Sequence, residues 1–215
     1  MNAGREERLM VAREAGYAAA LAVLFLGVLP ASADGIVSAY TKLDPETTCT
    51  TFAAAEPDEG GDWANMVCDG YRGYPIFLYY GDARESLFYG FPPAGDLAPA
   101  WESFDAFNST GPTVEWRIET AGERRMPFAT IHRWFVSEPD DGGGQIEVLV
   151  VAKVGQPAER QGCAVGYVVA TGNENANEKA RYIADNVVRD FICDADQPTI
   201  DQGTVPVPSF NRTAN

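Results

Sequence analysis

Short alternating and apolar runs dominate the middle of the chain, and they predict β-strands. The runs are rich in Val, Ile, Tyr and Phe and are separated by turns that contain Gly and Asp, a pattern typical of strands joined by tight connections. The expected strands cover residues 62–68, 74–80, 85–89, 113–119, 128–136, 145–154 and 163–170. In the run 145–154, alternate residues from Ile146 to Val154 are apolar and should face a core. Because the links are short, we expect a mostly antiparallel sheet of six to seven strands.

One long helix is predicted after the last of these strands. Asn175 followed three residues later by Glu178 is a capping signature, and apolar residues then recur at helical spacing over residues 176–191. Arg181 and Asp185 stand four positions apart and are expected to pair on the exposed face of this helix. The apolar stripe should pack on one face of the sheet.

The remaining segments have weaker patterns. In residues 90–111, large apolar side chains recur at roughly helical spacing and predict a short helix over the sheet. Residues 194–215 are polar, rich in Pro, Gly and Thr and without periodicity, so we expect a flexible C-terminal tail. The predicted fold class is therefore α+β, with a single domain over residues 34–193.

The first 33 residues are typical of an export signal. A start with three arginines precedes an apolar run over residues 17–29, followed by Pro30 and a small-residue triplet that ends at Ala33. This order predicts a secretory signal peptide cleaved after Ala33, although Met10 could equally be the first residue of the precursor. The apolar run is shorter than the about 20 residues that cross a bilayer, so we expect no stable membrane insertion after cleavage. The predicted location is periplasmic or extracellular.

The four cysteines all follow the predicted cleavage site, and an even count in an exported chain indicates disulfides. No C-x-x-C motif occurs, which argues against a thioredoxin-type redox site and a thiolate zinc site. The strand from residue 163 advances about 26 Å and the helix returns about 24 Å, which brings Cys193 beside Cys163. We therefore predict the pairs Cys163–Cys193 and Cys49–Cys68.

The chain is strongly acidic, with a formal net charge of −15, and the predicted signal segment contributes nothing to this balance because its three basic and three acidic residues cancel. Such a charge should repel nucleic acid and anionic membrane surfaces. It is compatible with basic partners or cations, and the simplest interpretation is solubility.

Six segments taken together resemble a group of small exported hypothetical proteins of alphaproteobacteria. The segments are CDGYRGYP (68–75), GPTVEWR (111–117), PFATIHRW (127–134), GCAVGYVVA (162–170), NANEKAR (175–181) and RDFIC (189–193). The resemblance covers roughly residues 40–193. It implies a signal peptide and paired cysteines, and it implies no activity.

The usual catalytic motifs are missing. His132 is the only histidine, no Gly-x-Ser-x-Gly elbow or phosphate-binding loop occurs, and paired cysteines leave no thiol nucleophile. We therefore expect His132 to be a structural or surface residue. The acidic loops 56–62 and 138–142 do not have the spacing of a calcium loop, so no metal or other cofactor is predicted.

Aromatic and arginine residues form the remaining candidate site. The ligand- or partner-binding candidates are Tyr74, Trp116, Arg117, Arg133 and Trp134, with Tyr71 and Arg72 beside the first of them. Arg and Trp are enriched where proteins bind partners. The alternative interpretation is that the tryptophans are core residues and that the arginines pair with Glu115 or Glu147 across strands.

Two functions remain open from the sequence. The first is a non-catalytic binding module for an envelope protein or a small ligand. The alternative is a hydrolase that uses two of the many carboxylates on a glycan substrate. A concave pocket with two carboxylates about 5–10 Å apart and no cationic partners would favour the hydrolase. A flat or convex aromatic patch would favour the binding module.

Overall fold

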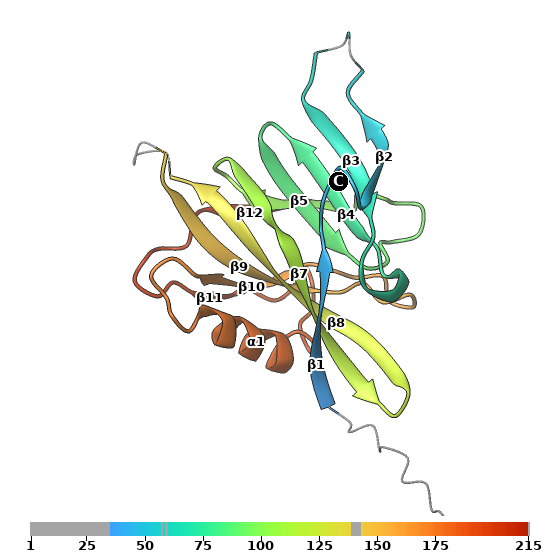
Figure 1. Ribbon diagram of the computed structural model, residues 1–215, viewed down its shortest axis with the longest axis vertical. Coiled ribbons are helices and arrows are strands. Elements are labelled where there is room, and N and C mark those ends of the chain that lie inside the picture. The colour runs from blue at the N-terminus through green and yellow to red at the C-terminus, as the bar shows by residue number, and fades with distance from the viewer. Residues whose placement is uncertain (1–34, 57, 59, 139–142, 215) are drawn as a thin grey trace, which may run out of the picture. The chain divides into compact units, whose positions relative to one another are not determined.

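Strands account for most of the fold, and a single long hairpin lies at its centre. The computed structural model describes residues 35–56, 58, 60–138 and 143–214 (Figure 1). The predicted signal segment 1–33 lies outside the described residues, as does most of the acidic loop 138–142. The described residues belong to one compact unit.

The largest sheet has six strands in the order β1-β7-β8-β9-β10-β11. Its strands are β1 (Gly35–Lys42), β7 (Asn108–Ala121), β8 (Arg124–Ser137), β9 (Gln145–Lys153), β10 (Ala164–Val169) and β11 (Thr199–Asp201). Every neighbouring pair is antiparallel except β10 and β11, which are parallel. Gly122 forms the tip of the β7–β8 hairpin with φ 58°, a conformation that a residue with a Cβ adopts less easily.

Two smaller antiparallel sheets complete the strand structure. The four-stranded sheet contains, in spatial order, β2 (Cys49–Ala54), β3 (Trp63–Cys68), β4 (Ile76–Gly81) and β5 (Arg84–Tyr89). The two-stranded sheet pairs β6 (Ala100–Phe104) with β12 (Phe210–Ala214). A short 3-10 turn, η1 (Tyr71–Gly73), precedes β4.

Alternating side chains give the six-stranded sheet two apolar faces. One face packs against the four-stranded sheet, in a core that includes Leu78, Leu87, Trp116, Val136 and Val148. The other face packs against the helix α1 (Ala176–Asn186), in a core that includes Ile131, Val151, Val165, Ala180 and Ile183. Figure 1 shows α1 against the six-stranded sheet near β9 and β10. The mostly antiparallel α+β fold predicted from the sequence is thus confirmed, although it is divided among three sheets.

The helix is shorter than the sequence predicts. It ends at Asn186, yet Val188 and Phe191 remain buried in the same core as the helix. The apolar stripe therefore continues through turns after the helix has stopped. Two adjacent β-branched residues, Val187 and Val188, stand where it ends, and such residues lose side-chain freedom in a helix.

Two predictions for the irregular segments are wrong. Residues 90–111 contain β6 and the start of β7 instead of a helix, and residues 194–215 contain β11 and β12 instead of a loose tail. The helix is also not C-terminal, because these two strands follow it. Both corrections have the same physical reason. Strands β6 and β12 pair with each other although about half of the chain separates them in sequence, and a local pattern does not reveal a distant partner.

Both predicted disulfides are confirmed. Cys49 and Cys68 lie opposite each other on β2 and β3, and Cys163 at the start of β10 joins Cys193 in the segment after α1. The described cysteines include no free thiol. Cross-links of this kind are typical of proteins from oxidising compartments.

Candidate functional site

Trp116 and Trp134 lie in the core between the two larger sheets. Trp116 is 0% exposed and donates its indole N–H to Thr41 Oγ1 over 2.8 Å. Trp134 is 4% exposed, and its ring meets Phe104 edge-on at 5.6 Å between centroids. Neither side chain reaches a surface where it could contact a partner. Both tryptophans are therefore core residues, as in the alternative interpretation of the sequence.

Arg117 and Arg133 both form ion pairs, but only the pair of Arg133 is the cross-strand contact of that interpretation. Arg117 lies 3.5 Å from Glu115 on its own strand, and Arg133 pairs with Glu147 between β8 and β9. Arg117 also makes a two-pronged contact with Asp185 of α1, with Nε–Oδ1 2.8 Å and Nη2–Oδ2 2.6 Å. Their partners account for both arginines without a ligand.

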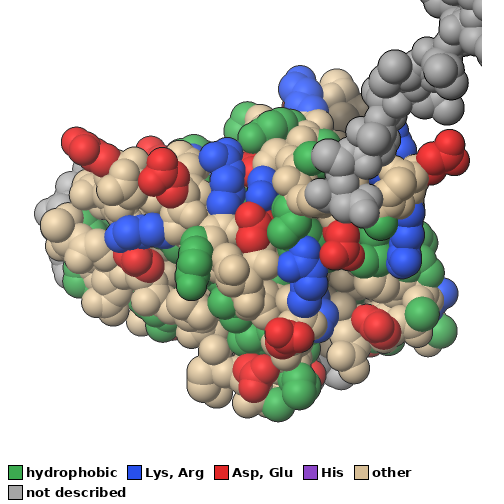
Figure 2. All heavy atoms as spheres, turned by 90° about the horizontal axis from the view of Figure 1, so that it is seen from below, with side chains coloured by type: hydrophobic (Ala, Val, Ile, Leu, Met, Phe, Trp, Pro, Cys, Tyr) green, Lys and Arg blue, Asp and Glu red, His purple; other side chains and the backbone are tan. Residues whose placement is uncertain are grey.

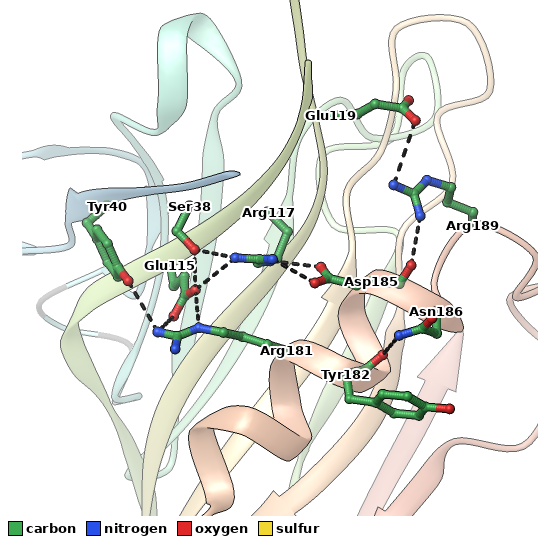
Figure 3. A network of polar contacts seen from close by, with 10 residues as sticks. All are labelled: Ser38, Tyr40, Glu115, Arg117, Glu119, Arg181, Tyr182, Asp185, Asn186 and Arg189. Carbon is green, nitrogen blue, oxygen red and sulfur yellow. Dashed lines mark hydrogen bonds and ion pairs between the residues drawn. The ribbon is translucent and has the colours of Figure 1, made fainter. Parts of the chain in front are cut away.

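The contacts of Arg117 belong to a larger set of side chains between β1, β7 and α1 (Figure 3). We call Ser38, Glu115, Arg117, Arg181 and Asp185 the Arg117 network. Glu115 accepts hydrogen bonds from Ser38 Oγ at 2.6 Å and from Arg181 Nε and Nη2 at 2.8 and 3.0 Å. Arg181 and Asp185 therefore face the sheet, and the predicted pairing between them on the exposed face of the helix is wrong.

The electrostatics of Glu115 reflect this complete set of partners. Burial opposes its ionisation, but hydrogen bonds from Arg181 and Ser38 and the positive charges of Arg181 and Arg117 outweigh burial and lower its pKa. Each member of the network has at least one hydroxyl or charged partner. The network therefore joins α1 to β1 and β7 through paired polar groups.

Tyr74 and its neighbours occupy the turn before β4. Tyr74 is half-buried, donates its hydroxyl to Gln156 Oε1 over 3.0 Å and meets Phe91 edge-on, and burial raises its pKa. The Arg72 guanidinium lies 5.5 Å from the ring centre of Tyr71. Tyr71 also packs against Trp116, with ring centroids 6.3 Å apart, and all the predicted aromatic residues belong to or pack against the same core cluster. The predicted aromatic and arginine residues therefore do not form a common exposed site.

His132 is a buried structural residue. Its Nε2 lies 2.6 Å from the carbonyl oxygen of Gly111, which can only accept, so Nε2 carries the proton. Nδ1 then accepts the hydroxyl proton of Tyr89 over 2.8 Å. Burial lowers the pKa of His132 to about 4, with a smaller opposing effect of the hydrogen bond to Gly111. The ring is therefore neutral, fully hydrogen-bonded and out of contact with solvent.

A cleft of about 230 Å³ between β6, β10, β12 and the segment after α1 is the strongest candidate site. We call it the Glu102 cleft. The residues that matter for its chemistry are Glu102, Ala164, Tyr167, Asp194, Phe210 and Arg212, and the Cys163–Cys193 disulfide supports one side. Concave sites with apolar walls and a few convergent polar groups are where proteins usually bind small ligands.

Glu102 is the central polar group of this cleft. Its side chain is 16% exposed, and its two oxygens accept the backbone N–H of Ala164 at 2.9 Å and Arg212 Nη1 at 3.2 Å. Arg212 also reaches Asp194, with Nη2–Oδ1 3.1 Å. Burial raises the pKa of Glu102, and the charge of Arg212 and the N–H of Ala164 offset this only in part. A carboxyl group in a cleft whose pKa is shifted by burial and a specific charged partner is a candidate functional residue.

The wall beside Glu102 is aromatic. Tyr167 and Phe210 stack with their ring centroids 3.9 Å apart, and Phe104 meets Tyr167 edge-on at 5.8 Å. Behind them, an inner cavity of about 20 Å³ is bordered by Glu102, Tyr167 and Trp134, which is room for about one water molecule. The buried indole N–H of Trp134 has no hydrogen-bond partner among the described residues.

The charge of the cleft is negative. Glu102, Asp194 and Asp196 border it together with a single cation, Arg212. Outside the cleft, the face in Figure 2 carries acidic and basic side chains side by side, without a large patch of one sign. In the described residues, no group of three or more His, Cys, Asp or Glu side chains is arranged to hold a metal ion. The carboxylates that border the cleft therefore outnumber its cation.

Sequence reasoning missed every member of this cleft except the disulfide. Glu102 lies in a segment with the spacing of a helix, and Arg212 lies in a segment without periodicity. The two residues are 110 positions apart and meet only because β6 and β12 pair. The sequence carries no signal for that pairing.

Comparisons with protein families, with curated proteins and with solved structures found no match for this chain. Within the described residues, no helix has both the length and the apolar character needed to cross a membrane.

Proposed function

We propose that this protein is an exported, non-catalytic binding module whose Glu102 cleft receives a positively charged group of its ligand. The observation that carries the proposal is that the described residues donate few hydrogen bonds to the Glu102 carboxylate. A carboxylate offers about four acceptor positions, and here one N–H of Ala164 and one of Arg212 are its protein donors. A further cationic donor would stabilise the charged form that burial disfavours.

The cleft is concave, but the charged groups in it favour binding over hydrolysis. A raised carboxyl pKa suits a general acid, but a hydrolase of this type needs a second carboxylate that can act on water or on the substrate. In this cleft Arg212 contacts both Glu102 and Asp194, so the two carboxylates share one cation. Both carboxylates are therefore held by an ion pair, an arrangement that suits recognition of a ligand better than proton transfer.

The proposed compartment is the periplasm or the extracellular space. Two disulfides support it, because such bonds persist in oxidising surroundings. The signal-like residues 1–33 point in the same direction. The ligand is accordingly an envelope protein or a small molecule met outside the cytoplasm, and nucleic acid is disfavoured by the net charge of −15.

An NMR titration with N-acetyl-arginine amide tests the proposal. The probe carries a guanidinium group on a short apolar stem, and we expect it to shift the backbone amide signals of Ala164 and Tyr167 in a saturable way. Glu102→Gln should abolish these shifts, whereas Glu123→Gln, at an exposed hairpin tip, should leave them unchanged. Absent shifts at Ala164, or equal shifts in a folded Glu102→Gln variant, would contradict the proposal.

A further inference from the structure

Strand β12 has one strand-pairing neighbour among the described residues. It pairs with β6, antiparallel, over the five residue pairs from Phe210–Phe104 to Ala214–Ala100, and its other contacts are made by side chains. The segment before it, residues 202–209, has no strand or helix and contains Gly203, Pro206 and Pro208. An isolated two-stranded pair is only marginally stable in water.

Strand β6 has its own attachments on the opposite side. The Glu102 backbone N–H donates to Ser86 Oγ over 2.9 Å, and Ser103 Oγ donates to the carbonyl oxygen of Glu85 over 2.7 Å. Asn108 Nδ2 also donates to Ser103 Oγ over 3.1 Å. Since these contacts join β6 to β5 and β7, β6 can keep its place when β12 is absent.

Two side chains of β12 fill the Glu102 cleft. Phe210 stacks on Tyr167, and Arg212, two positions later and thus on the same side of the strand, contacts Glu102 and Asp194. The strand thus presents an aromatic ring to the aromatic wall of the cleft and a guanidinium group to its carboxylates. In this sense β12 is an internal ligand of the proposed binding site.

We propose that β12 is displaceable and that the groove along β6 binds an extended polypeptide segment with an aromatic residue followed two positions later by arginine. This inference rests on the proposed function and names its partner class. The segment adds to β6 as a strand, which is a common mode of peptide recognition. Its aromatic side chain replaces Phe210 against Tyr167, and its arginine replaces Arg212.

Charge explains why the second position requires arginine. When β12 leaves, Glu102 and Asp194 lose their shared cation, and Glu102 stays buried beside the Ala164 N–H. The planar guanidinium can reach two carboxylates at once with separate N–H groups, as Arg212 does with Nη1 and Nη2. The compact ammonium group of lysine cannot reproduce this geometry.

Peptide binding to the full-length chain tests the inference. In the double variant Phe210→Ala/Arg212→Ala, the internal strand loses both anchors and no longer competes effectively. We expect a fluorescent peptide with the sequence of residues 206–214 to bind this variant saturably and at least tenfold more tightly than it binds the wild type. A peptide with lysine in place of its arginine should bind at least tenfold more weakly. A double variant with wild-type near-UV circular dichroism that does not bind the peptide would overturn the inference.

Hydrogen exchange on the wild-type protein provides a test that does not depend on how the variant folds. The β12 amides should exchange through local opening at least a hundredfold faster than those of β7 and β8 at the centre of the large sheet. Equal protection would overturn the inference. If N-acetyl-arginine amide shifts the Ala164 signal while the peptide fails to bind the folded double variant, the proposed cleft function stands and strand exchange is wrong.

Discussion

Two glutamates, the buried Glu115 and the largely buried Glu102, have opposite environments in this protein. Glu115, between β7 and α1, accepts three hydrogen bonds from Ser38 and Arg181 and lies 3.5 Å from Arg117, and its pKa is lowered (Figure 3). Glu102, between β6 and β12, has one backbone N–H and one arginine contact at 3.2 Å, and its pKa is raised. Burial opposes ionisation at both sites. At Glu115 the hydrogen bonds and positive charges outweigh it, and at Glu102 they do not.

The difference separates a structural ion network from a candidate binding site. The hydrogen bonds of the Arg117 network join α1 to the sheet. Glu102, in contrast, can accept further hydrogen bonds and borders an open cleft. A buried charge with too few partners costs stability unless another group completes its solvation.

Removing Arg117 should produce the largest loss of stability. Arg117→Ala removes the two-pronged contact with Asp185 and the positive charge beside Glu115. We therefore expect the free energy of unfolding to fall by about 3–5 kcal/mol. Denaturant unfolding of the oxidised protein measures this. Arg133→Ala is the matched control, because its pair with Glu147 is half-exposed and should contribute less than about 1 kcal/mol. Equal losses in the two variants would show that the network is not a structural clamp.

Each disulfide should contribute about 3 kcal/mol, and only one of them should affect the cleft. The cross-linked residues are 19 and 30 positions apart, so the two closed loops restrict the unfolded chain to a similar degree. Replacing either pair of cysteines by serine should therefore cost similar stability in denaturant unfolding. The response of the Ala164 amide to N-acetyl-arginine amide should weaken only in Cys163→Ser/Cys193→Ser, since that disulfide borders the cleft. Weakening in both variants would contradict a local role.

His132 should make the fold sensitive to acid. Its pKa is about 6.5 in the unfolded chain and about 4 in the folded protein, so the unfolded state binds the proton first as the pH falls. The stability contributed by the neutral ring is complete above pH 6.5 and is lost towards pH 4, by roughly 3 kcal/mol over this window. Unfolding free energies between pH 7 and pH 4 should therefore fall less steeply for His132→Gln than for the wild type. Parallel curves would contradict the assignment.

Glu102→Gln should have the smallest effect and the opposite pH dependence to that of His132. A carboxyl with a raised pKa in the folded state binds its proton more tightly there, so its ionisation destabilises the fold as the pH rises through and above its ordinary value of 4.5. The variant should therefore gain stability relative to the wild type with increasing pH, within about 1 kcal/mol, because the lost ion pair with Arg212 is partly exposed. Paired unfolding curves at several pH values measure this difference. A relative loss with rising pH would contradict the environment assigned to Glu102.

The sequence predicts the central sheet and the disulfides because their signals are local. The run from Ile146 to Val154 alternates clearly, and the lengths of the strand and helix between Cys163 and Cys193 determine where the chain returns. Strands β1 and β2 at sheet edges, and the short strands β6, β11 and β12, have no comparable pattern because few of their residues are buried on one face. Prediction therefore failed where a strand has a weak local pattern or a distant partner, whereas β5, also at a sheet edge, has a clear apolar run and is predicted correctly.

The candidate site follows the same rule. Arg117 and Trp116 stand out in the sequence as a basic and an aromatic residue inside a strand, but their partners, Asp185 and Thr41, lie far away in the chain and make both of them structural. Glu102 and Arg212 do not stand out in an acidic sequence with 31 Asp and Glu residues. Their importance comes from a contact that only the folded chain creates.

A pH titration of the glutamate side-chain carboxyl carbons by 13C NMR, with and without N-acetyl-arginine amide, tests the contrast between Glu102 and Glu115 most directly. The account predicts that Glu102 titrates above 4.5 and Glu115 below it, and that the probe moves the midpoint of Glu102 downward while Glu115 stays unchanged. A midpoint for Glu102 below that of Glu115, or a probe response at Glu115 and none at Glu102, would contradict it.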